Sequence, residues 1–295
     1  MQTRDFVRLL VLAAIWGGSF LFMRVAVVSL GPMATAQARV ALAGATVAAY
    51  LLFVGKRLDW RTHWRYYTAV GTINSAAPFA LYAWSAQYLP ASYLAVINAT
   101  SPVFGTLIAA IWLGDRLTAR AALGLAAGLA GVVLLVGLGP ITASPAVIAA
   151  TAAALGAAIC YAIGSAYVKR RAYSVDASAL AGGSNICAAF VLAPLAVASP
   201  PPGWPAPEAA WAAIGLGVLC TGVAYLLYYR LITDVGPARA LTVTFLIPAF
   251  GILWGALFLG EPVTAIMLAG CALVLVGTGL IFRRTRPNEA NRARR

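Results

Sequence analysis

The chain has 295 residues, of which 62% are hydrophobic and only 10% are charged. A soluble domain is about half apolar and about a quarter charged, so this composition excludes an ordinary soluble protein and is typical of an integral membrane protein. A formal net charge of +13 would suggest nucleic-acid binding in a soluble chain. The basic residues lie mainly between apolar segments, however, so we assign them to membrane topology and expect no nucleic-acid partner.

Ten apolar segments of about 20 residues follow one another along the chain. At a rise of about 1.5 Å per residue, such a segment can cross a hydrocarbon core of roughly 30 Å. The first is longer than the apolar part of a signal peptide and lacks a small-residue cleavage site, so we expect it in the mature protein. The predicted transmembrane helices are 7–29, 34–54, 66–88, 91–113, 118–138, 146–168, 177–198, 208–229, 237–259 and 263–282.

Basic residues occur in alternate connections. They are concentrated at the N-terminus, in the second, fourth, sixth and eighth connections and in the tail 283–295. The positive-inside rule therefore predicts that both termini are cytoplasmic, in a multi-pass protein of the plasma membrane, which in a bacterium is the inner membrane. The basic tail is expected to lie against anionic lipid. Lysine and arginine are absent from the intervening connections, 30–33, 89–90, 139–145, 199–207 and 260–262.

The chain resembles itself at an offset of 146 residues. Each copy contains five predicted helices, an odd number, so the second copy must enter the membrane from the opposite side. We therefore predict an all-α integral membrane protein of ten transmembrane helices, built as two inverted five-helix repeats at 7–138 and 146–282, with a basic cytoplasmic tail at 283–295. Inverted repeats around a midplane site are typical of secondary transporters. The aligned pairs include Gly71 and Gly217, Tyr82 and Tyr228, Pro102 and Pro248, Gly105 and Gly251, Gly124 and Gly270, and Gly131 and Gly277.

Two turns that correspond in the repeats differ in charge. LGDRLT at 113–118 carries Arg116, whereas LGEPVT at 259–264 carries Pro262 at the same place. The arginine is expected to help fix the orientation of a cytoplasmic turn. Asp115 and Glu261 then lie at opposite membrane faces, and we expect each to act locally, at the positive end of the helix that follows it.

Three segments resemble the ten-helix EamA branch of the drug/metabolite transporter superfamily. They are AAIWGGSFLFMRVAV at 13–27, INATSPVFGTLIAAIWLGDRLTARAALGLAAGLAGVVLLVG at 97–137 and FLIPAFGILWGALFLGEPVTAIMLAGCALVLVG at 245–277. The resemblance extends over nearly the whole chain and implies a transporter. Within the superfamily the sequence is similar to amino-acid and metabolite exporters, including aromatic amino-acid exporters of the YddG type, and export as a direction is implied by this resemblance alone.

Polar groups and deep aromatic rings on several predicted helices are candidates for a substrate cavity. Asn74, Pro78 and Tyr82 share one face of the third predicted helix, and Asn98 and Ser101 share one face of the fourth. The predicted substrate-binding residues are Trp16, Phe20, Asn74, Pro78, Tyr82, Asn98, Ser101, Tyr161, Thr244 and Pro248.

Prolines within the helices leave backbone carbonyls without their usual donors. Pro78, Pro102 and Pro248 each remove an N–H group, which frees the carbonyl four residues earlier. These carbonyls either face the cavity or accept from neighbouring Ser or Thr hydroxyls, in which case the prolines set kinks. Both interpretations stay open.

Arg24 and Arg39 lie within predicted helices, away from the cytoplasmic side. Each side chain can extend to the outer membrane interface. Arg39 is alternatively a partner for a substrate carboxylate, since ionisable groups inside membranes commonly mark a substrate pathway.

Acidic residues and His63 fall in connections, in the termini or at helix ends. Proton pumps and organic-cation exporters rely on an intramembrane acid, so we expect a secondary transporter of small neutral or zwitterionic metabolites, foremost amino acids including aromatic ones. The expected partners are the substrate and membrane lipids, with the protein as a monomer. Alternatives are a transporter of nucleosides, sugars or drugs, a receptor, or an intramembrane enzyme.

Neither an enzyme nor a cofactor is expected from the residues within the helices. An enzyme is disfavoured because no predicted helix carries a convergent set of acid, histidine and serine. No metal or other cofactor is expected either, because the cysteines lie inside predicted helices without C-x-x-C spacing. These cysteines are Cys160, Cys187, Cys220 and Cys271.

Overall fold

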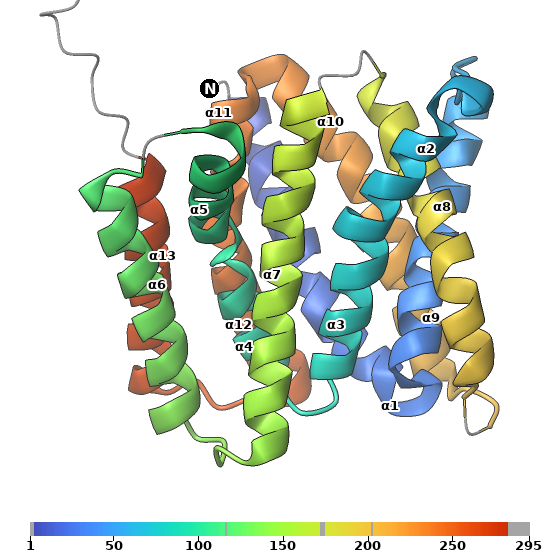
Figure 1. Ribbon diagram of the computed structural model, residues 1–295. Coiled ribbons are helices and arrows are strands. Elements are labelled where there is room, and N and C mark those ends of the chain that lie inside the picture. The colour runs from blue at the N-terminus through green and yellow to red at the C-terminus, as the bar shows by residue number, and fades with distance from the viewer. Residues whose placement is uncertain (1–2, 116, 172–174, 202, 283–295) are drawn as a thin grey trace, which may run out of the picture.

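The computed structural model describes residues 3–115, 117–171, 175–201 and 203–282, without the side chains of Pro237 and Ala238. Arg116 and the tail 283–295 therefore lie outside the described residues. The described part is all helical and contains no strand. Its helices run roughly side by side between two ends of a bundle, here called the proximal end, which carries the N-terminus, and the distal end opposite (Figure 1).

Six helical segments among the described residues are long and apolar enough to cross a membrane. They agree with an integral membrane protein, as the composition predicts. Their bounds are Thr3–Phe53, Ala91–Leu113, Ala119–Leu138, Pro145–Arg171, Ala177–Ala198 and Pro207–Val235.

Helix α1 (Thr3–Phe53) consists of two helical segments that meet at Gly31. The backbone there has φ 73° and ψ 168°, which is open to glycine and strained for any residue with a Cβ atom. Pro32 follows and cannot donate a helical hydrogen bond. The chain therefore bends sharply at the distal end of the bundle, between the first two predicted helices (Figure 1).

Two helices contain a wide, π-helical stretch near their middle. The first runs through α2 (Trp60–Gly71), η1 (Thr72–Ala76) and α3 (Ala77–Ser85), so it begins and ends earlier than the predicted 66–88. Pro78 cannot donate to the carbonyl of Asn74, and the N–H of Ala77 instead donates to the carbonyl of Thr72, five residues back. The second runs through α9 (Pro207–Ile214), η2 (Gly215–Val223) and α10 (Ala224–Val235).

A break in the fourth predicted helix separates α4 (Ala91–Asn98) from α5 (Ser101–Leu113). It precedes Pro102, and the hydroxyl of Ser101 donates to the carbonyl of Asn98 at 2.7 Å. A neighbouring hydroxyl therefore satisfies this carbonyl. At Pro102 this favours the second interpretation, in which the proline sets a kink. The remaining helices are α6 (Ala119–Leu138), α7 (Pro145–Arg171), α8 (Ala177–Ala198), α11 (Pro237–Ala240), α12 (Val243–Leu259) and α13 (Ala265–Phe282).

Helices α6 and α13 pack closely along one edge of the bundle (Figure 1). A Cβ atom at Gly124 would lie 2.6 Å from the carbonyl oxygen of Gly277. One at Gly131 would lie 2.6 Å from the carbonyl oxygen of Gly270. Small residues are required where two membrane helices approach this closely.

Candidate substrate cavity

A cavity of about 230 Å³ lies inside the bundle, between both segments of α1, the two wide stretches, the α4–α5 break and α7. Seven of the ten predicted substrate-binding residues line it, together with Arg39, the possible carboxylate partner; the seven are Trp16, Phe20, Asn74, Tyr82, Asn98, Ser101 and Tyr161. The sequence interpretation missed the other lining residues, which are Ser19, Phe79, Ser165, Cys220, Thr221, Tyr225 and Ile247. Cys220 corresponds to Asn74 at the offset of 146, so the repeat could have identified it.

Pro78, Thr244 and Pro248 are not among the lining residues. Pro78 is buried and acts on the backbone, because it belongs to the turn that widens the helix at Asn74. The hydroxyl of Thr244 donates to the carbonyl of Leu241 at 2.8 Å, so this group is engaged within its own helix. Ile247, the neighbour of Pro248, reaches the cavity instead.

The wide stretches present polar groups to the cavity. Asn74 lies in η1, and Cys220 and Thr221 lie in η2. The hydroxyl of Thr221 donates to the carbonyl of Leu216, five residues back, at 2.9 Å. Such π-helical turns occur frequently at functional sites, because the extra residue displaces the backbone and redirects side chains.

Aromatic rings form one wall of the cavity. The ring of Phe20 meets that of Tyr82 edge-on, with centroids 5.7 Å apart. Tyr82 in turn stacks against Tyr161 at 6.2 Å. The hydroxyl of Tyr82 is fully enclosed and donates to Oδ1 of Asn98 at 3.2 Å, which joins α3 to the α4–α5 break. The wall therefore combines apolar ring faces with a fixed polar contact.

Arg39 is the one charged residue in the described lining of the cavity. Its side chain is buried, with 7% of the residue exposed, so it does not extend to a membrane interface. Its Nε donates to Oγ1 of Thr221 at 3.0 Å, and its guanidinium carbon lies 3.7 Å from the centroid of the Phe79 ring. No carboxylate among the described residues forms an ion pair with it.

Arg24 has a different environment from Arg39. Its Nη1 donates to the carbonyls of Ala86 at 2.5 Å and Gln87 at 3.1 Å, at the C-terminal end of α3. A cation at this position satisfies carbonyls that the ended helix leaves free. Arg24 therefore fixes the end of this helix.

A second hollow, of about 610 Å³, continues from the cavity toward the proximal end of the bundle. The two share Ser101, Tyr161 and Ser165, and the second extends to Asp115 and Lys169. Nζ of Lys169 lies 3.4 Å from Oδ2 of Asp115, and more than half of each side chain is exposed. The polar centre of the molecule is thus open toward the proximal end, where α5 ends (Figure 1).

The distal end differs, because Glu261, which follows α12, contacts the start of α4 there. Its Oε1 accepts from the N–H of Ala91 at 2.7 Å, and its Oε2 accepts from the N–H and hydroxyl of Ser92 at 3.0 and 2.5 Å. Glu261 therefore binds the start of α4, whereas a role at the start of the helix that follows it was expected. Thr118 and Thr264 already cap the helices after the two turns, by accepting from backbone N–H groups at 3.2 Å.

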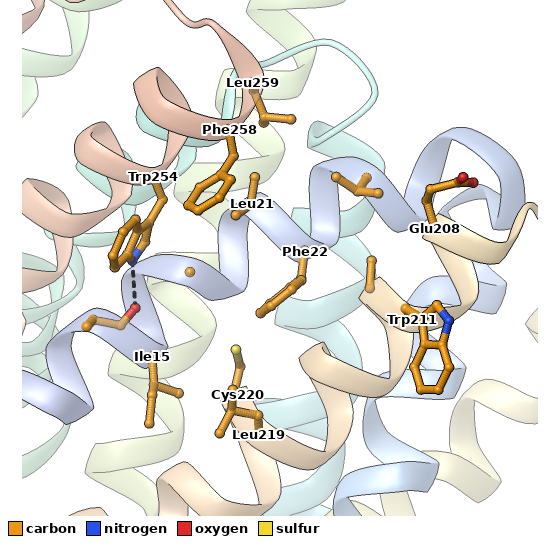
Figure 2. A pocket seen from close by; sticks show the side chains of 14 residues that line it. Ile15, Leu21, Phe22, Glu208, Trp211, Leu219, Cys220, Trp254, Phe258 and Leu259 are labelled. Carbon is orange, nitrogen blue, oxygen red and sulfur yellow. Dashed lines mark hydrogen bonds between the residues drawn. The ribbon is translucent and has the colours of Figure 1, made fainter.

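An apolar groove of about 580 Å³ lies on the other side of the first segment of α1, against η2 and α12. Figure 2 shows Phe22, Trp254 and Phe258 along it and Glu208 at one end. The indole N–H of Trp254 donates to the carbonyl of Ala14 at 2.9 Å, so it offers the groove no polar group. Because its exposed rings face outward and its lining is apolar, the groove suits lipid chains, and the central cavity is the candidate substrate site.

Comparison with known proteins gives the family. The model of the EamA-like transporter family matches the chain twice, over residues 6–137 and 148–283. A solved protein structure with a TM-score of 0.67 and 20% sequence identity, over 95% of this chain and 96% of that one, has the same fold.

Similar proteins are named as transporters. "Uncharacterized transporter YvbV" of Bacillus subtilis strain 168 is 24% identical over 98% of this chain and 95% of its own length. "Uncharacterized inner membrane transporter YedA" of Escherichia coli K12 is 27% identical over 94% of this chain and 90% of its own. "Probable terminal-alkyne amino-acid exporter" of Streptantibioticus cattleyicolor is 26% identical over 92% and 90%, respectively.

These matches extend over nearly the whole chain, and none of the named relatives is an enzyme. Together with the apolar helices they make the protein a multi-pass membrane transporter. The chain belongs to the EamA-like transporter family, within the drug/metabolite transporter superfamily.

Proposed function

We propose that this protein is a secondary transporter that exports or exchanges small zwitterionic metabolites, foremost amino acids with aromatic or other apolar side chains. The observation that carries the proposal is Arg39, a buried guanidinium in a cavity with no carboxylate among its described lining residues. A buried charge is costly unless an opposite charge accompanies it. A substrate carboxylate supplies that charge and pairs well with the fork of N–H donors on arginine.

The remaining lining fits the other parts of an amino acid. The rings of Trp16, Phe20 and Tyr82 provide apolar walls for its side chain. The amide oxygens of Asn74 and Asn98 are acceptors suited to its ammonium group, and aromatic faces attract cations. A relative named as an amino-acid exporter supports this substrate class.

The proposed architecture has ten transmembrane helices in two inverted repeats, 7–138 and 146–282. The double match of the family model supports it. The contacts of Gly124 with Gly277 and of Gly131 with Gly270 support it as well. The offset of 146 residues pairs Gly124 with Gly270 and Gly131 with Gly277, so it converts the first contact into the second. A two-fold axis between the repeats requires this relation. Alternating access then follows from rocking one repeat against the other, with the proximal end cytoplasmic.

Proteoliposomes loaded with unlabelled tryptophan test the substrate class. Labelled tryptophan is expected to exchange into them, and tryptamine, which lacks the carboxylate, is expected to compete at least tenfold more weakly. Arg39→Met is expected to abolish exchange, and Arg39→Lys to retain part of it, because lysine keeps the charge without the fork of donors. Equal competition by tryptamine would contradict the assignment of a carboxylate to Arg39.

Arg230→Met is the matched control for these variants. Arg230 is exposed and pairs with Asp234 at 3.3 Å, away from the cavity. It is expected to exchange substrate normally, so the loss in Arg39→Met can be attributed to the cavity. If no amino acid is exchanged by the folded parent protein, the substrate class is wrong.

A further inference from the structure

Glu261 joins α4 to the end of α12 at the distal end of the bundle, opposite the end that the open hollow reaches. We propose that Glu261 is the gating residue of this transporter, because its carboxylate fastens α4 to α12 and must release α4 before the cavity can open on the distal side. The inference rests on the proposed function in that it assigns the contact to a step of alternating access. It does not depend on which substrate is carried.

Glu261 follows directly after α12 and binds the first turn of α4, far away in sequence. Its two carboxylate oxygens accept three hydrogen bonds, from the N–H groups of Ala91 and Ser92 and from the hydroxyl of Ser92. The N–H groups in the first turn of a helix have no partners within that helix. A carboxylate satisfies them, and its negative charge is stabilised by the positive end of the helix dipole.

Two glycines of α12 make room for this contact. A Cβ atom at Gly255 would lie 2.5 Å from Oε2 of Glu261, which is closer than real contacts allow. A Cβ atom at Gly251 would lie 2.3 Å from the Cβ atom of Ala95, in α4. The close approach of α4 to α12 therefore requires glycine at position 251, and a methyl group at position 255 would displace the carboxylate of Glu261.

The first repeat differs in sequence at this contact, because Pro237, the counterpart of Ala91 at the offset of 146 residues, has no N–H group to donate. The offset of 146 residues pairs Glu261 with Asp115, whose side chain is shorter, and Gly255 with Ala109. The two turns share their backbone form, since the N–H of Glu261 donates to the carbonyl of Gly255 at 3.1 Å and that of Asp115 to the carbonyl of Ala109 at 3.3 Å. Yet the carboxylate of Asp115 contacts the exposed Lys169, beside the open hollow. The chain is thus built to favour a state open at the proximal end.

Labelling of one reporter cysteine from each side of the membrane tests the gate. Ser19 lines the cavity and is buried, with 4% of the residue exposed, so Ser19→Cys is placed in a chain whose native cysteines are replaced by alanine. A membrane-impermeant thiol reagent is applied to vesicles of known orientation. With Glu261 intact, reaction from the distal side is expected to be slow, and Glu261→Gln is expected to accelerate it about tenfold, because the amide loses the charge of the carboxylate.

Gly255→Ala is the second variant, because it leaves the carboxylate in the chain and displaces it with one methyl group. It is expected to increase distal labelling in the same direction as Glu261→Gln. Asp115→Asn, the equivalent change at the other end, and Gly137→Ala, whose Cβ atom would meet nothing within 4 Å, are the matched controls and should leave distal labelling unchanged.

The labelling needs no substrate, so it separates the gate from the proposed function. If amino acids are not transported but distal labelling rises in Glu261→Gln and Gly255→Ala, the gate stands and the substrate assignment fails. If folded Glu261→Gln and Gly255→Ala proteins label from the distal side no faster than the parent, the gate is refuted. If Glu261→Gln does not fold, Gly255→Ala and Ser92→Ala take its place, since Ser92→Ala removes one of the three donors. Faster distal labelling in these two variants supports the gate, and an unchanged rate refutes it.

Discussion

Arg39 is a buried cation, and its neighbours only partly compensate for its charge. Thr221 accepts one hydrogen bond, and Phe79 offers the face of its ring. A neutral hydroxyl and a ring face are weaker partners for a guanidinium than a carboxylate is. This incomplete compensation is what the proposed pairing of Arg39 with a substrate carboxylate would complete.

Trp16 and Asn98 lie near Arg39 in the cavity lining and allow a test of the apolar and polar walls. Trp16→Ala removes ring surface, and Asn98→Ala removes the acceptor of the Tyr82 hydroxyl. Each is expected to weaken apparent substrate affinity by about tenfold, or roughly 1.4 kcal/mol, without loss of the folded protein. Exchange kinetics measure the apparent affinity, and gel filtration measures the amount of folded protein. Normal exchange by both variants would show that the cavity is not the substrate site.

At the scale of single elements, α8 begins with a cap whose charge is well defined. The carboxylate of Asp176 accepts from the N–H groups of Ser178 at 3.0 Å and Ala179 at 3.2 Å, and lies 2.6 Å from Nζ of Lys56. Partial burial opposes its ionisation, but the hydrogen bonds from Lys56, Ser178 and Ala179 outweigh this and lower the pKa of Asp176 from 3.8 to about 2. Hydrogen bonding to Asp176 likewise raises the pKa of Lys56.

Asp176→Ala is expected to destabilise the folded protein by about 1 kcal/mol at neutral pH, because it removes the cap of α8. The exposed ion pair with Lys56 adds little to this. Since the pKa is lower in the folded state, the contribution is present above about pH 4 and decreases as the pH falls toward 2. Thermal unfolding in detergent over this range measures it. Asp176→Asn, which keeps a capping oxygen, should lose much less stability, and an equal loss would contradict the role of the cap.

The positions of the elements could be predicted from the sequence because apolar length and the offset of 146 residues are local or periodic signals. The polar faces around Asn74 and Asn98 could be predicted for the same reason, and the structure places both residues in one cavity. The contact of Glu261 with α4 could not be predicted, because it joins segments about 170 residues apart and produces no periodic pattern in the sequence. Likewise, the π-helical turns depend on hydrogen bonds that hydropathy does not report.

At the scale of the whole molecule, the distribution of basic residues predicts which end of the bundle is cytoplasmic. Lys169 and Arg170 lie at the end of α7, and the connection 139–145 at its other end has no basic residue. The positive-inside rule therefore predicts that the proximal end faces the cytoplasm. The open hollow that reaches Lys169 would then receive substrate from inside the cell.

Fusions on the two sides test this orientation. A green fluorescent protein joined after Phe282 is expected to fluoresce, and alkaline phosphatase inserted after Ile141 is expected to be active, because these reporters work in the cytoplasm and in the periplasm, respectively. The reverse fusions, with the two reporters exchanged, serve as the control. An active phosphatase after Phe282 would invert the topology and would place the Glu261 contact on the cytoplasmic side.

The close packing of α6 against α13 also constrains the order in which the protein is made. Gly124 and Gly131 of α6 leave the ribosome more than a hundred residues before their partners Gly270 and Gly277. At a synthesis rate of about 5 to 20 residues per second, α6 waits in the membrane for roughly ten seconds with its glycine surface against lipid. Insertion of α13 therefore completes this edge of the bundle, and a chain truncated before α13 would present the glycine surface of α6 to any other helix it meets.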